Sequence, residues 1–222
     1  ENIYIVTNVE YYYEVKGQLI GINDEAIESI ICEPIAKNTL PAITNAVNEI
    51  EKKCRTAVIG TFSSDHEIGN PNQFREIYDR AVLFAKKNYL VIFGIEPTEP
   101  NCGYGYIKPG EKVSSEFDNL FIVDKFIEKP NLADAENFIR DGFFWNSGMF
   151  LFKASHYLKE LELHRPDIYE ACQLSMKDIS KDNDFLRVNE IVFSACPSDS
   201  IDYAVMEKTD DAVVVPTDAG WS

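Results

Sequence analysis

The stretches TAVIGTF, residues 56–62, and YLVIFGI, residues 89–95, decide the fold of this chain. Each is a short run of apolar and β-branched residues without strict apolar–polar alternation, which indicates a strand buried on both faces. Between them, residues 71–88 place apolar side chains on one face of a helix that has Pro71 in its first turn. Two buried strands joined by an amphipathic helix predict an α/β structure.

The same alternation of strands and helices begins earlier in the chain. Residues 3–7 and 29–34 have the pattern of buried strands, and helices are expected around residues 10–20 and 40–51, the second capped by Asn38 or Thr39. We therefore predict a doubly wound, mostly parallel α/β sheet, with a mixed sheet in the second half of the chain from Phe121 onward.

Composition narrows the possible functions. The net charge of −16, from 37 acidic and 21 basic residues, argues against a nucleic-acid or anionic-membrane partner, since both need clustered Lys and Arg. Five cysteines without CxxC or zinc spacing favour a reducing cytoplasm. No signal peptide opens the chain, and no apolar run approaches the roughly 20 residues of a membrane helix. A small phosphorylated ligand stays open, because it needs only a few well-placed donors and a divalent cation.

Ligands of α/β sheets gather at the carboxyl ends of the strands, so the residues that follow each strand are the candidates. Asp65 follows the strand at residues 56–62, where a carboxylate suits Mg²⁺. Spacing alone favours a plainer interpretation, a turn or cap aspartate. Gly105, between two tyrosines, suits either close approach of the backbone to a ligand or a bulge.

FIEKP, residues 126–130, lies where a strand ends and a helix capped by Asn131 begins. Adjacent strand residues point to opposite faces, so Glu128 and Lys129 form an ion pair only if the backbone bends. On general grounds a solvated surface pair is favoured. Further along, Asn146 in the stretch WNSG offers both a donor and an acceptor for sugar hydroxyls.

In their order along the chain, several segments resemble the mannose-1-phosphate guanylyltransferases of the bacterial long-chain type. They are EPIAKNTLPAI (33–43), SSDHEI (63–68), GIEPTEPNCGYGYI (94–107), FIEKP (126–130), FFWNSGMFLF (143–152), RPDIYEAC (165–172), SIDYAVMEKT (200–209) and VVVPTDAGWS (213–222). The resemblance implies a sugar-nucleotidyltransferase fold and transfer of GMP from GTP to α-D-mannose 1-phosphate. GDP-mannose and pyrophosphate are then the products, and Mg²⁺ is the cofactor.

The resemblance also implies roles for single residues of the acceptor site. Gly105 matches the glycine whose backbone approaches the sugar. Glu128 resembles the residue that accepts hydrogen bonds from the mannose hydroxyls. Lys129 resembles the catalytic cation that contacts the sugar phosphate. Asn146 is similar to a further sugar contact.

For the nucleotide, the resemblance implies that Asp65 is a catalytic, metal-binding carboxylate. Glu33, Asn38 and Thr39 match a segment expected to line the guanine pocket. Lys37 stands where the family has an arginine, which keeps the charge and loses the planar fork. Phe62-Ser63 stands where the family has Leu-Pro.

The family's glycine-rich loop precedes the first residue of this chain, and its second metal-binding Asp directly follows Ser222. We therefore expect residues 1–222 to be a single nucleotidyltransferase domain without these parts, with little transferase activity alone. A missing first strand would also leave a sheet edge open and favour a homo-oligomer.

Two alternatives stay open. One is a non-catalytic relative that binds sugar nucleotides. The other is part of a bifunctional enzyme whose mannose-6-phosphate isomerase activity lies in a further C-terminal domain.

Overall fold

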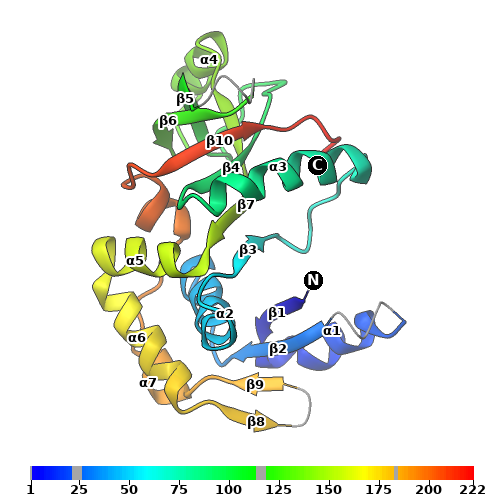
Figure 1. Ribbon diagram of the computed structural model, residues 1–222, viewed down its shortest axis with the longest axis vertical. Helices are drawn as coiled ribbons and strands as arrows, with labels where there is room; N and C mark the ends of the chain where they lie inside the picture. The colour runs from blue at the N-terminus through cyan, green and yellow to red at the C-terminus, as the bar shows by residue number, and fades with distance from the viewer. Residues whose placement is uncertain (1, 22–26, 114–118, 183–184) are drawn as a thin grey trace. The chain divides into compact units, whose positions relative to one another are not determined.

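The chain forms two compact units (Figure 1). The first comprises residues 1–55 and 158–204, and the second comprises residues 56–157 and 205–222. The computed structural model describes residues 2–21, 27–113, 119–182 and 185–222. Among these, no helix is both long and apolar enough to cross a bilayer. The division into two compact units does not test the expectation of a single nucleotidyltransferase domain, which stays a prediction.

The first unit is built on a four-stranded sheet in the order β1-β2-β9-β8. Its strands are β1 (Ile3–Asn8), β2 (Ile27–Glu33), β8 (Ser180–Asp182) and β9 (Phe185–Arg187). β1, β2 and β9 run parallel, and β8 is antiparallel to β9. The helical elements of this unit are η1 (Val9–Tyr11), α1 (Tyr12–Leu19), α2 (Thr39–Lys53), α6 (Pro166–Lys177) and α7 (Glu190–Ser194).

The second unit is built on a six-stranded sheet in the order β3-β7-β4-β10-β6-β5. Its strands are β3 (Val58–Thr61), β4 (Leu90–Ile95), β5 (Tyr106–Lys112), β6 (Phe121–Ile127), β7 (Phe144–Lys153) and β10 (Ala212–Pro216). β7 also pairs with β5. Its helices are α3 (Pro71–Ala85) and α4 (Leu132–Arg140), while α5 (Ala154–His164) and the π-helical turn η3 (Asp202–Met206) each contain one boundary between the units.

Two apolar clusters fill the second unit. The α3 cluster joins α3 to the sheet and consists of Ala81, Phe84, Ala85, Val91, Phe93, Leu120, Met149, Leu151, Val213 and Val215. The smaller α4 cluster consists of Tyr106, Ala135, Phe143 and Trp145. β4 contributes to the core along nearly its whole length, since residues 90–94 are all buried. Burial on both faces explains why its sequence lacks alternation.

The α/β class, the predicted strands and the mixed sheet in the second half are confirmed. The capping predictions also hold, because Asn38 accepts a hydrogen bond from the backbone N–H of Thr39, and Asn131 from that of Asp134. The helix expected over residues 71–88 ends at Ala85, and Asn88, with a φ of 69°, turns the chain toward β4.

The structure differs from the prediction in how the strands pair. The strands of the first half fall into two sheets, and in the six-stranded sheet only the β4–β10 pair is parallel among the described pairings. The reason is that β7 lies between β3 and β4 and is antiparallel to both. An apolar run encodes burial on two faces, but not the direction of its neighbours.

Replacing Gly94 by alanine is expected to destabilise the second unit. A Cβ there would lie 2.6 Å from Val214 Cγ2 and 3.0 Å from Phe144 Cβ, on the two strands that flank β4. Overpacking of this kind costs about 1–3 kcal/mol of unfolding free energy, which urea unfolding measures. The control is Gly17→Ala in α1, where nothing lies within 4 Å of the new Cβ. Equal unfolding midpoints for Gly94→Ala and the unmodified chain would contradict the expectation.

Candidate functional site

Gly105, Glu128 and Asn146 meet in the second unit because three strands pair in register beside them. Tyr106 at the start of β5 lies opposite Ile127 of β6 and opposite Trp145 of β7. Gly105, which precedes Tyr106, therefore lies between Glu128, which follows Ile127, and Asn146, which follows Trp145. The backbone N–H of Asn146 donates to the carbonyl of Gly105 at 2.8 Å, which fixes the β5–β7 side of the group.

Gly105 leaves room for the carboxylate of Glu128. A Cβ at Gly105 would collide with Glu128 Oε2 and lie 3.2 Å from Asn146 Cβ. Two of the predicted sugar-binding side chains therefore pack closely against Gly105, while close approach of its backbone to a ligand stays a prediction.

Gly105→Ala is expected to impair function more than stability. The carboxylate of Glu128 is the far end of a flexible side chain and can swing away, so the fold survives while the carboxylate is displaced. In the full-length protein we expect the KM for the sugar phosphate to rise about tenfold, the effect of one misplaced hydrogen-bonding group. Thermal unfolding is the control, and an unchanged KM would show that Glu128 need not lie beside Gly105.

Glu128 and Lys129 form an ion pair at the junction after β6. Lys129 has a φ of 49°, and its Nζ lies 3.5 Å from Glu128 Oε1. The backbone therefore makes the bend that an ion pair between adjacent residues requires. The pair is also unequal, with the Glu128 side chain 9% exposed and that of Lys129 58% exposed. A buried carboxylate beside an exposed ammonium is unlike the evenly solvated surface pair that general considerations favour.

Asn146 lies at an irregularity in the pairing of β7 with β4. The register shifts between Ile92 and Gly94, and Gly148 adopts a φ of 72° on the β7 side. Asn146 Oδ1 accepts a hydrogen bond from the backbone N–H of Gly148 at 3.0 Å. Such irregularities re-aim side chains and are common next to active sites. The positive φ of Gly148 within β7 thus helps to set the direction of the Asn146 amide.

Asp65 lies in the loop between β3 and α3 and is exposed. The hydroxyl of Ser63 donates to its carboxylate and is the main reason that the pKa of Asp65 lies below its usual range. The carboxylate is thus ionised at neutral pH and open to solvent, which fits a ligand of a hard divalent cation. Further along this loop, residues 67–70 pair with residues 219–222.

Glu33 and its neighbours lie in the first unit, at the end of β2. The Glu33 carboxyl is buried, and Asn45 Nδ2 of α2 donates to its Oε1 at 3.1 Å. Burial raises the pKa of Glu33 to about 7, and the hydrogen bond from Asn45 opposes part of this shift. Lys37 donates from Nζ to the carbonyl of Ser194 at 2.9 Å, so the lysine that replaces the family's arginine contacts backbone.

Asn38 and Thr39 are both exposed at the start of α2. Asn38 has a φ of 69°, a strained value for a residue other than glycine. Thr39 Oγ1 accepts a hydrogen bond from the backbone N–H of Ile201 at 3.2 Å. Both side chains therefore have local structural partners, and their proposed contacts with guanine stay predictions.

Two residues that hydrogen-bond to predicted site residues were not identified from the sequence. Glu207 accepts a hydrogen bond from the backbone N–H of Glu128 at 3.2 Å and so holds the bend after β6. Asn45 orients the carboxyl of Glu33. Glu207 belongs to the stretch SIDYAVMEK, and Asn45 follows EPIAKNTLPAI by two positions, so proximity to a motif was the available signal. Neither partner is predictable from spacing, because Glu207 is 79 residues from Glu128.

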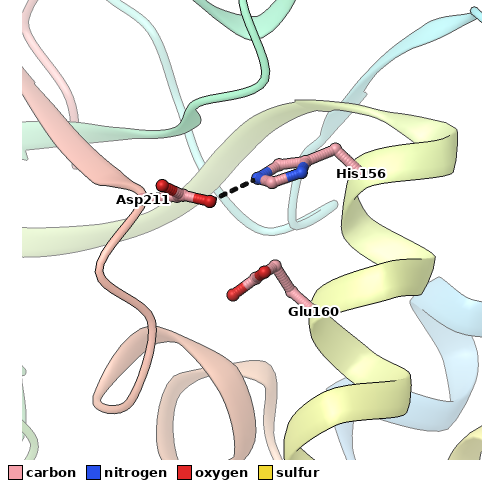
Figure 2. Close-up of side chains that lie close together, drawn as sticks. All are labelled: His156, Glu160 and Asp211. Atoms are coloured by element: carbon pink, nitrogen blue, oxygen red, sulfur yellow. Dashed lines mark ion pairs between the residues drawn. The ribbon is translucent and has the colours of Figure 1, made fainter.

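An imidazole–carboxylate pair lies elsewhere in the second unit, where α5 begins and β10 is about to start. His156 Nε2 is 3.2 Å from Asp211 Oδ2, and the two side chains face each other (Figure 2). His156 is buried and Asp211 is half-exposed. The pair includes none of the predicted site residues, and it ties the first turn of α5 to the approach to β10.

The nucleotidyl transferase family model matches residues 1–222, and the chain belongs to this family. It is similar to the mannose-1-phosphate guanylyltransferase of Escherichia coli K12, with 43% identity over 226 residues that cover 100% of this chain and 47% of that protein. The chain thus spans about half the length of the curated relatives it matches. The family resemblance noted in the sequence motifs is confirmed.

Solved structures similar to the chain include two at more than 25% identity. A mannose-6-phosphate isomerase from Helicobacter pylori has a TM-score of 0.90 and 28% identity, and the match covers 100% of this chain and 85% of that one. A mannose-1-phosphate geranyltransferase from Thermus thermophilus has a TM-score of 0.85 and 26% identity, covering 99% of this chain and 60% of that one. The sugar-nucleotidyltransferase type of α/β fold is confirmed.

Proposed function

We propose that the full-length protein transfers GMP from GTP to α-D-mannose 1-phosphate, giving GDP-mannose and pyrophosphate. Family membership and the 43% identity to a mannose-1-phosphate guanylyltransferase support the reaction class. The observation that carries the acceptor side is the junction of Gly105, Glu128 and Lys129. There a buried carboxylate lies against a glycine, with an exposed ammonium 3.5 Å from it. A carboxylate accepts hydrogen bonds from sugar hydroxyls, and an ammonium neutralises a phosphate.

The chemistry is a substitution at phosphorus. A phosphate oxygen of mannose 1-phosphate attacks the α-phosphorus of GTP, a P–O bond forms, and the bond to the departing pyrophosphate breaks. In this proposal Lys129 binds the attacking phosphate, while Glu128 and Asn146 orient the sugar. Such a reaction depends on positioning and on stabilisation of developing charge. The elements around the junction are suited to positioning, because three paired strands hold these side chains.

We propose Asp65 as one protein ligand of Mg²⁺. Its exposed carboxylate, with a lowered pKa, supports this role. When bound, Mg²⁺ supplies positive charge that neutralises the triphosphate. Glu33, Asn38 and Thr39 are proposed for the guanine pocket, since their side-chain oxygens can accept from the N–H groups that guanine presents. We also propose a cytoplasmic location, which the five free thiols support.

The test is an assay of the full-length protein with Mg²⁺, GTP and mannose 1-phosphate, following pyrophosphate release and the sugar nucleotide formed. dTTP, ATP and glucose 1-phosphate are the competing substrates. We expect GTP and mannose 1-phosphate to give the highest kcat/KM. A preference for dTTP or ATP would overturn the nucleotide assignment. Binding of GDP-mannose without pyrophosphate release from any substrate pair would favour the non-catalytic relative instead.

A second candidate function is isomerisation of mannose 6-phosphate by the full-length protein. One observation favours it, the TM-score of 0.90 to a protein described as a mannose-6-phosphate isomerase. We assign no isomerase chemistry to residues of this chain. Conversion of mannose 6-phosphate to fructose 6-phosphate, assayed in the same preparation, separates the bifunctional enzyme from a transferase alone.

A further inference from the structure

We propose that Trp221 is a positioning residue, which holds the loop carrying Asp65 against the loop carrying Gly105. The inference rests on the proposed function, in which Asp65 binds Mg²⁺ and Gly105 lies against the sugar. Trp221 lies in the stretch VVVPTDAGWS, and no role for it was predicted from the sequence.

The backbone of Trp221 is paired with the Asp65 loop. Residues 219–222 run antiparallel to residues 67–70, through four hydrogen bonds of 2.8 to 3.1 Å and a bridge between Ile68 and Trp221. The two segments approach closely at Gly69, where a Cβ would lie 3.2 Å from the carbonyl oxygen of Gly220. This pairing begins two residues beyond Asp65. A shift of residues 219–222 would therefore move the Asp65 loop with it.

The side chain of Trp221 extends this connection to the sugar side. Its ring centroid lies 5.3 Å from that of His66 and 5.8 Å from that of Tyr104, with interplanar angles of 77° and 67°. Tyr104 in turn lies 5.0 Å from Trp145 at 62°. Edge-to-face contacts of this kind are a favoured geometry for aromatic pairs. The rings of His66, Trp221, Tyr104 and Trp145 thus form a continuous row within the second unit.

Each of the other rings in this row is the chain neighbour of a proposed site residue. His66 follows Asp65, Tyr104 precedes Gly105, and Trp145 precedes Asn146. The row therefore runs directly beside the residues whose spacing the reaction depends on, and Trp221 is its link between the two loops. The imidazole of His66 also lies near Gly148, since a Cβ there would be 3.7 Å from His66 Cε1.

Two features of the Trp221 side chain bear on this role, its packing and its indole N–H. It is half-buried and packs against both the α3 cluster and the α4 cluster. Yet its indole Nε1 is buried and finds no hydrogen-bond acceptor in the described part of the chain. A buried donor without an acceptor is destabilising, and a phenylalanine would avoid that loss. The N–H has no part in the proposed role, so a phenylalanine should serve as well as the tryptophan. Because the contacts with His66 and Tyr104 need a ring, the ring is the feature that the proposal assigns to positioning.

The experiment compares Trp221→Leu and Trp221→Phe in the full-length protein. Leucine removes the edge-to-face contacts, whereas phenylalanine keeps an aromatic ring and removes the unpaired N–H. The matched control is Tyr89→Leu, which removes a ring that packs against the same α3 cluster at the start of β4, away from both loops. Two readouts are used: kcat and KM for pyrophosphate release, and hydrogen exchange of the backbone amides of residues 67, 69, 70 and 146.

We expect Trp221→Leu to lower kcat about tenfold with smaller changes in KM, because the two loops no longer hold the reacting groups at a fixed spacing. The same variant should speed exchange of the amides at residues 67, 69 and 70, which donate to residues 219–222, and at Asn146, which donates to Gly105. Trp221→Phe is expected to restore both readouts, and Tyr89→Leu to lower the melting temperature while leaving kcat and these amides unchanged.

Two results would overturn the proposal: unchanged kcat and exchange in Trp221→Leu, or an equal loss of kcat in Tyr89→Leu, which would reduce the effect to stability. Failure of the proposed function looks different, because the unmodified protein then releases no pyrophosphate. In that event hydrogen exchange alone decides whether Trp221 holds the two loops together. Faster exchange only in Trp221→Leu would support the positioning role. Equal exchange in all variants would exclude it.

Discussion

Lys129→Ala is expected to lower the rate of pyrophosphate release by the full-length protein about 100- to 1,000-fold, the usual effect of removing one group that stabilises charge in a transition state. The Nζ of Lys129 lies in solvent, 3.5 Å from the buried carboxylate of Glu128, and in our proposal it neutralises the sugar phosphate. Steady-state kinetics with GTP and mannose 1-phosphate measure the effect. The melting temperature is expected to change little, because the side chain contributes no core packing.

A second variant separates folding from catalysis at this position. Lys129→Gly removes the ammonium and also relieves the left-handed backbone, with a φ of 49°, which costs a non-glycine residue about 1–2 kcal/mol. This variant should be at least as stable as the unmodified protein and as inactive as Lys129→Ala.

The matched control is Lys108→Ala, which removes an exposed lysine 2.8 Å from Asp124 in the same sheet. An ion pair between two solvent-exposed side chains contributes little to stability, so activity and stability should both be nearly unchanged. Full activity in Lys129→Gly would return Glu128 and Lys129 to a structural role.

Glu33→Gln is expected to stabilise the chain at pH 8 and to have little effect at pH 4. Burial raises the pKa of Glu33 from 4.5 to about 7 in the folded protein. Below pH 4.5 the carboxyl is protonated in both states, so it adds no pH dependence. As the pH rises from 4.5 to 7, the unfolded chain loses this proton while the folded chain keeps it, and the unfolding free energy falls by about 3 kcal/mol.

The measurement is urea unfolding of Glu33→Gln and of the unmodified protein at pH 4 and at pH 8. The change in unfolding free energy between the two pH values is then compared between the two proteins, as a difference of differences. This subtraction cancels the contribution of the other titrating groups. Glutamine preserves an Oε1 for the hydrogen bond from Asn45 Nδ2, which is 3.1 Å in length. A difference of differences near zero would mean that Glu33 is ionised in the folded protein at neutral pH.

Several features of the candidate site were predictable from the sequence. The junction after residues 121–127 follows from an apolar run that ends before Pro130, and the helix start follows from Asn131. That Glu128 and Lys129 would lie at a strand end was therefore clear. The sequence did not predict the positive φ of Lys129, nor that the carboxylate of Glu128 would be buried while the ammonium of Lys129 is exposed. Glu207, which accepts from the backbone N–H of Glu128, and Gly105, which leaves room for its carboxylate, are both distant in the chain.

The same division holds for Glu33. Its position at the end of β2 was predictable from the apolar run before it. The burial of Glu33 and its raised pKa were not predictable from the sequence, because they depend on the packing of α2 and on the amide of Asn45. Desolvation is a property of the surrounding atoms rather than of local sequence.

By itself, the sequence determined where the strands and helices of residues 3–95 lie, that Asn38 and Asn131 cap helices, and the order of motifs that marks the family. These properties depend on the period and composition of short segments. Only the tertiary structure decided that β7 would run between β3 and β4, that Gly105, Glu128 and Asn146 would meet across three strands, and that Trp221 would lie between His66 and Tyr104. The physical reason is that a strand's sequence specifies how much of it is buried, while its partners and register follow from packing among segments far apart in the chain.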